Sequence, residues 1–366
     1  MKIEQLRLRH VFGSFAVEQP FWEERLVMPL DVYDEFRHGA PELRPDSMGE
    51  HDAVFLQVET DDGVYGIAGP MGTSVAGIIA TQLRPLLVGR DPLAHEFLWD
   101  IMHRSLVHGR QGEAMMAISA VDCALWDLKG RHLGVPVYLL LGGPTRTEVP
   151  AYASMLGFDV TDMGRVRERA LWAKDQGYRA QKWFFRHGPM SGADGLALNV
   201  ALVRTLREAL GANDEIMLDC WQSMDVSYVL RLAERIGEFQ PRWLEEVCMP
   251  DRVDSYARVR ESIDIPLAGG LTEVLKIAAL GTSHDLITIP HGHSTPAGIH
   301  FSVTQSPIHT PWQEYLLKWN EVHQMFLTNP LRPVDGMLRP PDAPGLNMEL
   351  DPNRIEREED FASAPG

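Results

Sequence analysis

A repeated alternation of short apolar strands and amphipathic helices constrains the fold of this chain more than any other feature. From Val149 onward, apolar runs of strand length are each followed by a segment with helical periodicity. Repeated βα units of this length are typical of a parallel sheet, either a barrel or a doubly wound sheet. The expected strands are 149–155, 178–185, 216–219, 243–245, 265–268, 286–290 and 312–317. These are about seven strands, one fewer than a closed eight-stranded barrel contains.

The residues before this alternation have a different character. Residues 1–68 favour antiparallel β structure with a hairpin turn at 61–63, interrupted by a long polar insertion at 19–50. Loops of that length inside a domain are usually functional lids or disordered. Helical periodicity then marks the segments 75–87, 93–104 and 113–133. The first part of the chain is therefore expected to be an α+β unit.

The length of the chain, 366 residues, exceeds what one ordinary compact core contains. We expect an α+β domain at 1–145 and a βα domain at 146–330. The tail at 331–366 is rich in proline, aspartate and glycine and carries one apolar segment. We expect this tail to return to the first domain.

Composition excludes several classes of function. The formal charge of -17 argues against nucleic acid or an acidic membrane as the main partner. No apolar run approaches membrane-spanning length, and the charged, alternating N-terminus is typical of a strand and not of a signal peptide. The three cysteines form no CxxC pair and have no zinc-type spacing, which favours reduced thiols. We therefore expect a cytoplasmic protein.

Two neighbouring strands of the βα region each end in an acid. Asp219 closes one apolar run and Glu245 closes the next, with one helical crossover, 226–237, between them. Because parallel strands in such a unit finish on the same side of the sheet, the two carboxylates are expected to lie side by side. Mg²⁺ is commonly held by one or two carboxylates, with water and substrate completing its shell. Alternatively, both acids cap the helices that follow or pair with basic neighbours.

Further polar residues stand at the ends of the expected strands. If these ends form one rim, it carries Lys182, Asp219, Glu245, His291 and Glu314. Taken singly, the lysine is more simply explained as a surface residue, the histidine as a loop residue and the last acid as a helix cap. Polar residues at successive strand ends are harder to dismiss, because barrel enzymes keep their chemistry there.

Several motifs together resemble one known family. They are AVDCALWDLKG at 120–130, GVPVY at 134–138, LGG at 141–143, MLDCW at 217–221, WLEE at 243–246, GLTE at 270–273, KIAA at 276–279 and PHG at 290–292. In this order they resemble the enolase superfamily, mandelate racemase subgroup, and within it the L-rhamnonate dehydratases and related acid-sugar dehydratases. The resemblance covers nearly the whole chain, and its motifs are highly specific in combination.

The resemblance implies a fold and a site. The fold would be an α+β capping domain over a modified (β/α) barrel, with Mg²⁺ held at the strand ends. By position, Asp219 and Glu245 match family metal ligands, and His291 matches a barrel histidine that acts as base. Lys182 matches a lysine near the substrate carboxylate, and Glu314 matches an acid that helps to stabilise that carboxylate. Relatives also assemble into symmetric homo-oligomers.

The resemblance further implies a reaction. Phe184 occupies the position of a second lysine that serves as a base in the racemases, so a two-base racemase is disfavoured. Dehydration of a sugar acid to a 2-keto-3-deoxy acid, with His291 moving the proton, is the expected activity. Specificity in the family comes from capping-domain loops, which makes Arg25, Tyr33, Arg37 and Arg44 candidates for binding the polyol. Ordinary surface charge explains these four residues equally well.

One departure from the family pattern lies between Gly269 and Gly270. Relatives have a further helix and strand there, roughly 30 residues by the usual size of a βα unit. That piece carries a third metal ligand and the aspartate that orients the base. Either residues of the natural protein are omitted here, or the deletion is genuine. If the natural protein contains this piece, we expect an Mg²⁺-dependent dehydratase. If the protein lacks it, a non-catalytic relative is favoured. An epimerase or cycloisomerase is a third alternative.

Overall fold

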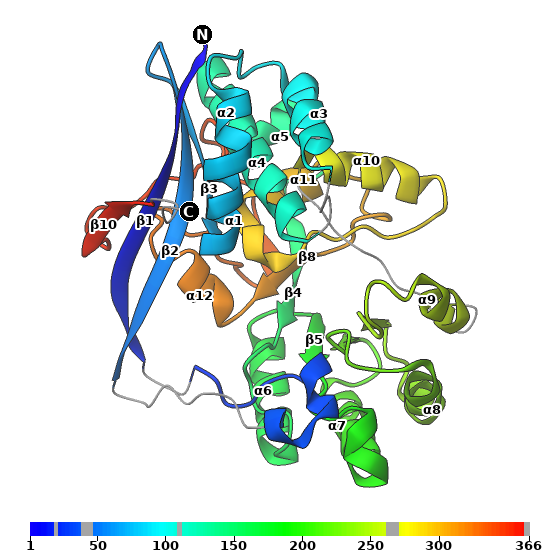
Figure 1. The fold of residues 1–366 in the computed structure, drawn as a ribbon. Helices are drawn as coiled ribbons and strands as arrows, with labels where there is room; N and C mark the ends of the chain where they lie inside the picture. The colour runs from blue at the N-terminus through cyan, green and yellow to red at the C-terminus, as the bar shows by residue number, and fades with distance from the viewer. Residues whose placement is uncertain (18–20, 38–46, 108–111, 261–270, 362–366) are drawn as a thin grey trace.

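The structure is a computed structural model, and it describes residues 1–17, 21–37, 47–107, 112–260 and 271–361. It contains an antiparallel sheet formed mainly by the N-terminal part of the chain and a second, mainly parallel sheet formed by the middle part. Figure 1 shows the antiparallel sheet, drawn mainly in blue, with later yellow and orange parts of the chain packed beside it, and the green middle part of the chain below. The expected combination of an antiparallel capping sheet and a parallel barrel-like sheet is confirmed.

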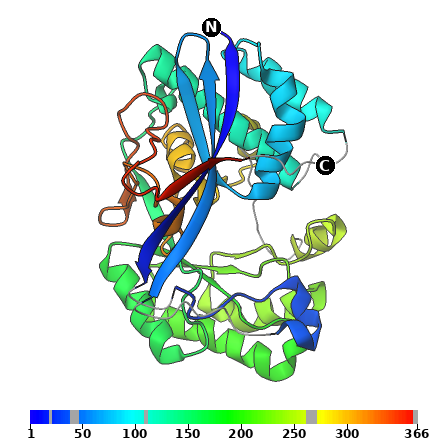
Figure 2. The ribbon, with the colours of Figure 1, turned by 60° about the vertical axis from the view of Figure 1, so that its left-hand side comes forward.

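The antiparallel sheet has the strand order β10-β1-β2-β3. Its strands are β1 (Ile3–Val17), β2 (Ser47–Thr60), β3 (Tyr65–Met71) and β10 (Arg357–Asp360). The pairing of β1 with β2 runs from Ile3 opposite Thr60 to Val17 opposite Ser47, so β2 begins within the residues 19–50 expected to form a loop. Figure 2 shows this long ribbon with the C-terminal strand β10 along its edge.

Helices cover one face of this sheet. They are α1 (Thr73–Ile78), a π-helical turn (Ile79–Leu83), α2 (Arg84–Leu87), α3 (His95–Ser105), α4 (Glu113–Leu133) and the short α5 (Val137–Leu140). Helix α4 buries the predicted apolar stripe, including Ile118, Val121 and Leu128. It approaches β3 so closely that a Cβ atom on Gly66 would lie 2.0 Å from the carbonyl oxygen of Ala124. This close approach requires glycine at that position.

The second sheet has the order β7-β6-β5-β4-β8. Its strands are β4 (Val149–Ser154), β5 (Ala180–Phe184), β6 (Glu215–Asp219), β7 (Trp243–Glu245) and β8 (Gln313–Leu316), all paired in parallel. The two-residue strand β9 (Met337–Leu338) pairs antiparallel with β4. The last of the parallel strands, β8, pairs with the first, β4, as in a barrel, and among the described residues the sheet is open between β7 and β8.

The helices of this region follow the predicted alternation. They are α6 (Met163–Asp175), α7 (Gly192–Leu210), α8 (Val226–Ile236), α9 (Val253–Arg260), α10 (Leu271–Thr282), α11 (Thr295–Ser302) and α12 (Trp319–His323). Helix α10 is tied to the capping domain, because Asp122 of α4 accepts hydrogen bonds from the backbone and the hydroxyl of Thr272 at 2.8 and 2.5 Å. Figure 1 shows α10 beside α4 and apart from α9.

Two expected strands need comment. The prediction of a strand at 286–290 is wrong, because these residues form no strand in the described structure. Thr288 donates one backbone hydrogen bond to His309, 2.7 Å away, but an apolar run becomes a strand only beside a strand partner. The strand expected at 265–268 lies outside the described residues.

Each sheet has its own hydrophobic core. One core lies between the antiparallel sheet and its helices, and it contains Leu8, Leu56 and Leu125. Another surrounds the parallel sheet and contains Trp183 and Leu218. Within the described ranges, no helix combines the length and the apolar character needed to cross a membrane.

Candidate active site

Strand register brings the predicted acids together. Asp219 at the end of β6 lies opposite Glu245 at the end of β7, and Phe184 of β5 lies opposite Asp219. Lys182 stands on β5, two residues before the strand ends, and Glu314 stands on β8. The parallel arrangement therefore gathers four of the five predicted rim residues at one end of the sheet.

Lys182 lies at the centre of this group. Its Nζ atom is 2.7 Å from Glu245 Oε1, 2.8 Å from Glu314 Oε1 and 3.4 Å from Asp219 Oδ2. The side chains of Lys182 and Glu314 are only 4% and 1% exposed, so solvent screens their charges poorly. The lysine is thus a buried cation shared by three carboxylates, and the interpretation of Lys182 as a surface residue is wrong.

The group carries an excess of negative charge. Burial first lowers the pKa of Lys182, but the carboxylates of Glu245 and Glu314 outweigh burial and raise it well above its ordinary value. Burial raises the pKa of Glu314, yet Lys182 and then His291 bring it well below its usual range. Burial, with Glu245 nearby, raises the pKa of Asp219 to about 7 although Lys182 acts in the opposite direction. Three carboxylates around one ammonium leave two negative charges when all are ionised, which a divalent cation would balance.

Hydrogen bonds orient each carboxylate. The backbone N–H of Trp221 donates to Asp219 Oδ1 over 3.0 Å. The indole Nε1–H of Trp243 donates to Glu245 Oε2 over 3.0 Å. The backbone N–H of Gly292 donates to Glu314 Oε2 over 2.8 Å. The remaining oxygens of these side chains converge on Lys182, so the acids are fixed in direction.

Asp219 and Glu245 carry carboxylate oxygens, the kind of ligand that Mg²⁺ prefers. Burial, followed by the negative charge of Glu245, raises the pKa of Asp219 although Lys182 acts in the opposite direction. In the described part of the chain, no group of three or more histidine, cysteine, aspartate or glutamate side chains is arranged to hold a metal ion. Asp219 and Glu245 are two carboxylates, so a magnesium ion between them would need further oxygen ligands to complete its shell.

His291 lies just before the short 3-10 helix Gly292–Ser294. Its chain neighbour Gly292 is bonded to Glu314, which places the histidine beside the acidic group. A Cβ atom on Gly292 would lie 2.9 Å from Glu314 Cγ, so this approach favours glycine. The side chain of His291 is exposed, as a base that meets a substrate must be.

Sequence reasoning missed three histidines around His291. His293 stacks on His291 with ring centroids 4.3 Å apart, and His323 of α12 lies 4.6 Å from His293. Burial lowers the pKa of His323, and His51, on β2 of the capping sheet, lowers it further. His293 was detectable from the HGHS sequence that follows Pro290. The other two come from distant parts of the chain, and no local pattern marks them.

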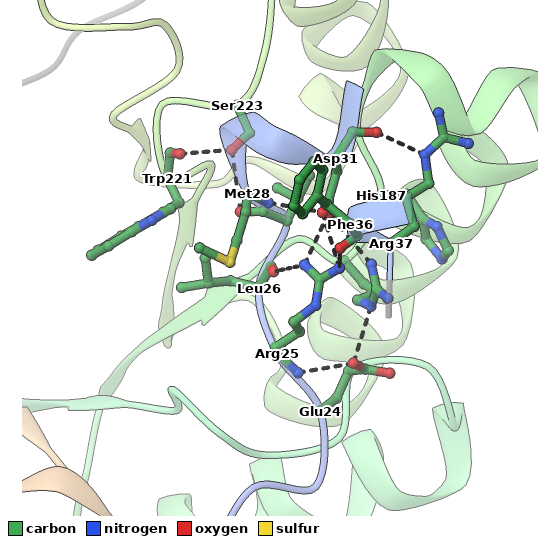
Figure 3. Close-up of polar contacts among 12 residues, drawn as sticks. Glu24, Arg25, Leu26, Met28, Asp31, Phe36, Arg37, His187, Trp221 and Ser223 are labelled. Atoms are coloured by element: carbon green, nitrogen blue, oxygen red, sulfur yellow. Dashed lines mark hydrogen bonds and ion pairs between the residues drawn. The ribbon is translucent and has the colours of Figure 1, made fainter. Parts of the chain in front are cut away.

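The predicted substrate-binding residues lie in the loop of residues 21–37, which docks on the barrel. Val27 donates to the carbonyl of Phe185 at 2.8 Å, and Ser223 Oγ donates to the carbonyl of Val27 at 3.2 Å. Figure 3 shows Leu26 and Met28 of this loop close to Trp221 and Ser223. The loop therefore lies next to the strand that bears Asp219.

Arg25 and Arg37 both bind to Asp31 and so stabilise the conformation of this loop. Arg25 forms a two-pronged ion pair with Asp31, with both distances 2.9 Å, and Arg37 Nε donates to the backbone carbonyl of Asp31 at 2.7 Å (Figure 3). Tyr33 is 60% exposed. Arg44 lies outside the described residues. A role for these residues in binding substrate stays a prediction.

Comparison with known proteins shows the family. Residues 37–142 match the family described as mandelate racemase / muconate lactonizing enzyme, N-terminal domain. Residues 165–270 and 262–354 match the enolase C-terminal domain-like family. An L-rhamnonate dehydratase of Saccharopolyspora erythraea is 32% identical over 402 residues, which cover 96% of this chain and 97% of that relative.

Solved structures of other proteins resemble this chain in fold. A rhamnonate dehydratase from Gibberella zeae complexed with Mg has a TM-score of 0.81 and 27% identity, covering 96% of this chain and 95% of that chain. A racemase from Streptomyces coelicolor A3(2) with bound magnesium has a TM-score of 0.77 and 26% identity, covering 96% and 98%. The chain therefore belongs to the enolase superfamily and carries the domains of its mandelate racemase and muconate lactonizing enzyme group.

Proposed function

We propose that this protein is an Mg²⁺-dependent dehydratase of a sugar acid of the L-rhamnonate type. The observation that carries the proposal is the buried group of Lys182, Asp219, Glu245 and Glu314, which has one fixed cation and needs a second. The similarity to rhamnonate dehydratases supports the choice of reaction. A proton next to a carboxylate is very weakly acidic, so its removal requires positive charge of this kind.

Asp219 and Glu245 would hold the magnesium ion. When bound, such an ion offsets the negative charge that develops on the substrate carboxylate as the α proton leaves. Lys182 adds a fixed positive charge from β5, and its ion pairs hold the ammonium in place. Glu314 orients Lys182 and fixes the backbone before His293 through Gly292.

His291 would act first as base and then as acid. It takes the α proton, and the C–H electron pair moves toward the carboxylate carbon. The bond from the β carbon to its hydroxyl then breaks, and the hydroxyl leaves as water with a proton from the imidazolium of His291. The resulting enol becomes the 2-keto-3-deoxy acid. Phe184, 2% exposed in the core, cannot act as a second base, which disfavours racemisation.

The loop of residues 21–37 would determine which sugar acid binds. Arg25, Tyr33 and Arg37 lie on it, and Arg44 follows it in the sequence. Because the loop is docked beside β5 and β6, its polar groups stand near the proposed reaction centre. The predicted homo-oligomer and cytoplasmic location remain predictions, and the free cysteines Cys123, Cys220 and Cys248 are compatible with a reducing compartment.

We also propose that the domains of the chain meet at about residues 145 and 330. Within the second domain, we propose that one βα unit is missing next to Gly270. Two observations support the missing unit. The family match to the second domain is split into 165–270 and 262–354. The alignment with the Saccharopolyspora erythraea relative spans 402 residues, more than this chain contains, so that relative has residues without a counterpart here.

The intact mass of the protein purified from its natural source tests whether the missing unit is an omission. A mass above 41.1 kDa by one βα unit, on the order of 3 kDa, indicates omitted residues. A mass equal to 41.1 kDa makes the deletion real and favours the non-catalytic alternative.

Activity is tested by incubating the protein with Mg²⁺ and a panel of sugar acids while 2-keto acid formation is followed. Turnover of at least one acid, lost on chelation and in His291→Asn, is expected. Exchange of the α proton with deuterated solvent without formation of keto acid would instead indicate an epimerase. Magnesium binding without turnover or exchange across the panel would contradict the dehydratase proposal.

A further inference from the structure

Glu23 lies near the start of the loop of residues 21–37 and is bound by groups of the βα part of the chain. Its Oε1 atom is 3.1 Å from Lys318 Nζ and 3.5 Å from Arg169 Nη2. Its Oε2 atom accepts a hydrogen bond from the backbone N–H of Asp159 at 3.2 Å. The side chain of Glu23 is only 5% exposed, so solvent screens these interactions poorly. An acid from the N-terminal part of the chain is therefore held by two cations from the βα part.

Backbone contacts and a ring contact surround the same point. The backbone N–H of Glu23 donates to the carbonyl of Gly157 at 2.8 Å, and Lys318 Nζ donates to the same carbonyl at 3.0 Å. Gly157 has a φ of 89°, and a Cβ atom on it would lie 3.1 Å from the carbonyl oxygen of Phe21. Both its conformation and the close approach of the loop favour glycine there. The ring of Phe21 also packs edge-on against Trp319, with centroids 5.1 Å apart.

This anchor lies at the end of the sheet that carries the candidate site. Gly157 lies just beyond the end of β4, whose neighbour β5 carries Lys182. Lys318 lies just beyond the end of β8, the strand that carries Glu314. Strands β4 and β8 are paired with each other. Glu23 is therefore fixed next to the ends of two adjacent strands at the edge where the acidic group is gathered.

The rest of the loop is held together and is docked a second time. Asp31 binds both terminal nitrogens of Arg25 at 2.9 Å, which ties the loop to itself (Figure 3). Glu24 accepts from Arg186 Nε, just beyond the end of β5, at 3.0 Å. Because the internal contacts hold the loop together, its position over the sheet depends on its anchors. Glu23 supplies the anchor at β4 and β8, and Glu24 supplies the anchor at β5.

We propose that Glu23 is a positioning residue that fixes the loop of residues 21–37 over the ends of β4 and β8 and so determines how this loop meets the sugar acid. The inference rests on the proposed function, in which this loop determines which acid binds. Glu23 itself does not touch the substrate. It acts through the placement of Arg25 and the other polar groups of the loop.

The alternative is that Glu23 only stabilises the contact between the two parts of the chain. A buried ion pair is weak evidence for stability, because lost hydration offsets much of the attraction between the charges. The two roles predict different results. A purely stabilising residue lowers the free energy of unfolding and leaves the KM of the substrate unchanged. A positioning residue changes KM and the choice between substrates while the fold is kept.

Three substitutions separate these roles. Glu23→Gln keeps the size and one acceptor oxygen but removes the charge, whereas Glu23→Leu removes charge and acceptor together. Lys318→Met removes the nearer of the two cations. Glu208→Gln is the matched control, because it removes an exposed ion pair between Glu208 of α7 and Arg167 of α6. Circular dichroism verifies that each variant is folded.

The first experiment is hydrogen exchange of the intact protein without substrate, followed by mass spectrometry. We expect peptides within residues 21–37 to exchange about tenfold faster or more in Glu23→Leu and Lys318→Met, and by a smaller factor in Glu23→Gln. Peptides from β4, β5 and β6 should exchange as in the wild type, and Glu208→Gln should change neither set. Unchanged exchange of the loop in Glu23→Leu would overturn the inference, as would faster exchange throughout the chain.

The second experiment measures kcat and KM for two sugar acids that differ at the end away from the carboxylate. Glu23→Leu should raise the KM of the preferred acid about tenfold with little change in kcat, because binding common to ground state and transition state is lost. The preference between the acids, as the ratio of their kcat/KM values, should shrink, and Glu23→Gln should recover part of both effects. Unchanged KM and preference would show a structural role only and overturn the inference. If the wild type has no activity, the proposed function fails, while hydrogen exchange still decides whether Glu23 anchors the loop.

Discussion

Two buried groups of charged side chains, one in the capping domain and one in the parallel sheet, differ in how they are satisfied. In the capping domain, fully buried Asp127 accepts from the backbone N–H groups of Ile67 and Leu346 at 2.8 and 2.6 Å and from Arg131 Nε at 2.7 Å. Arg131 also forms an ion pair with Glu349, near the C-terminus. At the strand ends of the parallel sheet, by contrast, Lys182 faces three carboxylates alone.

The difference distinguishes a structural charge from a functional one. Asp127 joins β3, α4 and the C-terminal tail. Both of its carboxylate oxygens accept hydrogen bonds from groups of the same domain. In the group around Lys182, burial together with the negative charge of Glu245 raises the pKa of Asp219 to about 7 although Lys182 lowers it. Such a group costs folding free energy unless a cation binds, and perturbed groups of this kind cluster at functional sites.

The strongest test of the structural group is Asp127→Ala. This change leaves two backbone donors and the guanidinium of Arg131 without their partner in a buried place, and it should lower the free energy of unfolding by about 3–5 kcal/mol. Urea denaturation followed by circular dichroism measures it. The control is Asp100→Ala, which removes an exposed ion pair with Arg104 on α3 and should change stability by less than about 0.5 kcal/mol. Similar effects of both changes would contradict the structural role of Asp127.

The corresponding test of the functional group is Lys182→Met. Methionine fills the space but leaves Glu314, which is 1% exposed, without its cation, so the unfolding free energy should fall by about 3 kcal/mol and turnover should be lost. Added Mg²⁺ should restore part of the stability, because it supplies positive charge to the carboxylates. Lys276→Met, which removes an exposed pair with Glu96, is the control. Undiminished turnover in Lys182→Met would rule out the proposed role.

The functional group should also make metal affinity depend on pH. Because the pKa of Asp219 is raised to about 7, this carboxylate is protonated below pH 7 and must lose its proton to bind a metal. Apparent Mg²⁺ affinity should therefore be constant well above pH 7 and fall about tenfold for each pH unit below it. Isothermal titration calorimetry between pH 5 and 8 checks this expectation. An affinity that stays constant down to pH 5 would show that Asp219 is not a ligand.

The smallest expected effect is on stability without metal. A carboxyl whose folded pKa is raised destabilises the fold above its unfolded pKa, so stability falls as pH rises from about 4 to 7. Asp219→Asn should therefore increase metal-free stability at pH 8 by about 1 kcal/mol while abolishing Mg²⁺ binding, because asparagine can still accept from Trp221. Thermal unfolding at pH 8 and pH 5 measures the difference. A loss of stability at pH 8 would mean that the ion pair with Lys182 outweighs burial.

The sequence by itself determined the order of strands and helices and the acids at the strand ends. The apolar runs that end at Asp219 and Glu245 are local, and parallel pairing makes their meeting predictable. Helix α4 followed its apolar stripe from Glu113 to Leu133, and Gly134 ended it with a positive φ of 68°. By contrast, the apolar run at 286–290 predicted a strand, but pairing depends on a neighbour that a local pattern cannot supply.

Only the tertiary structure decided which charges face each other. No local pattern in the sequence distinguishes Lys182 from other lysines. Folding brings its Nζ atom within 2.8 Å of Glu314, a residue 132 positions away. Likewise, Arg25 resembles a free surface charge in the sequence, and only the folded loop shows its pairing with Asp31. Periodicity reports which face of an element is buried. The energy of a charge depends on distances to groups from other elements, and those distances exist only after the chain has folded.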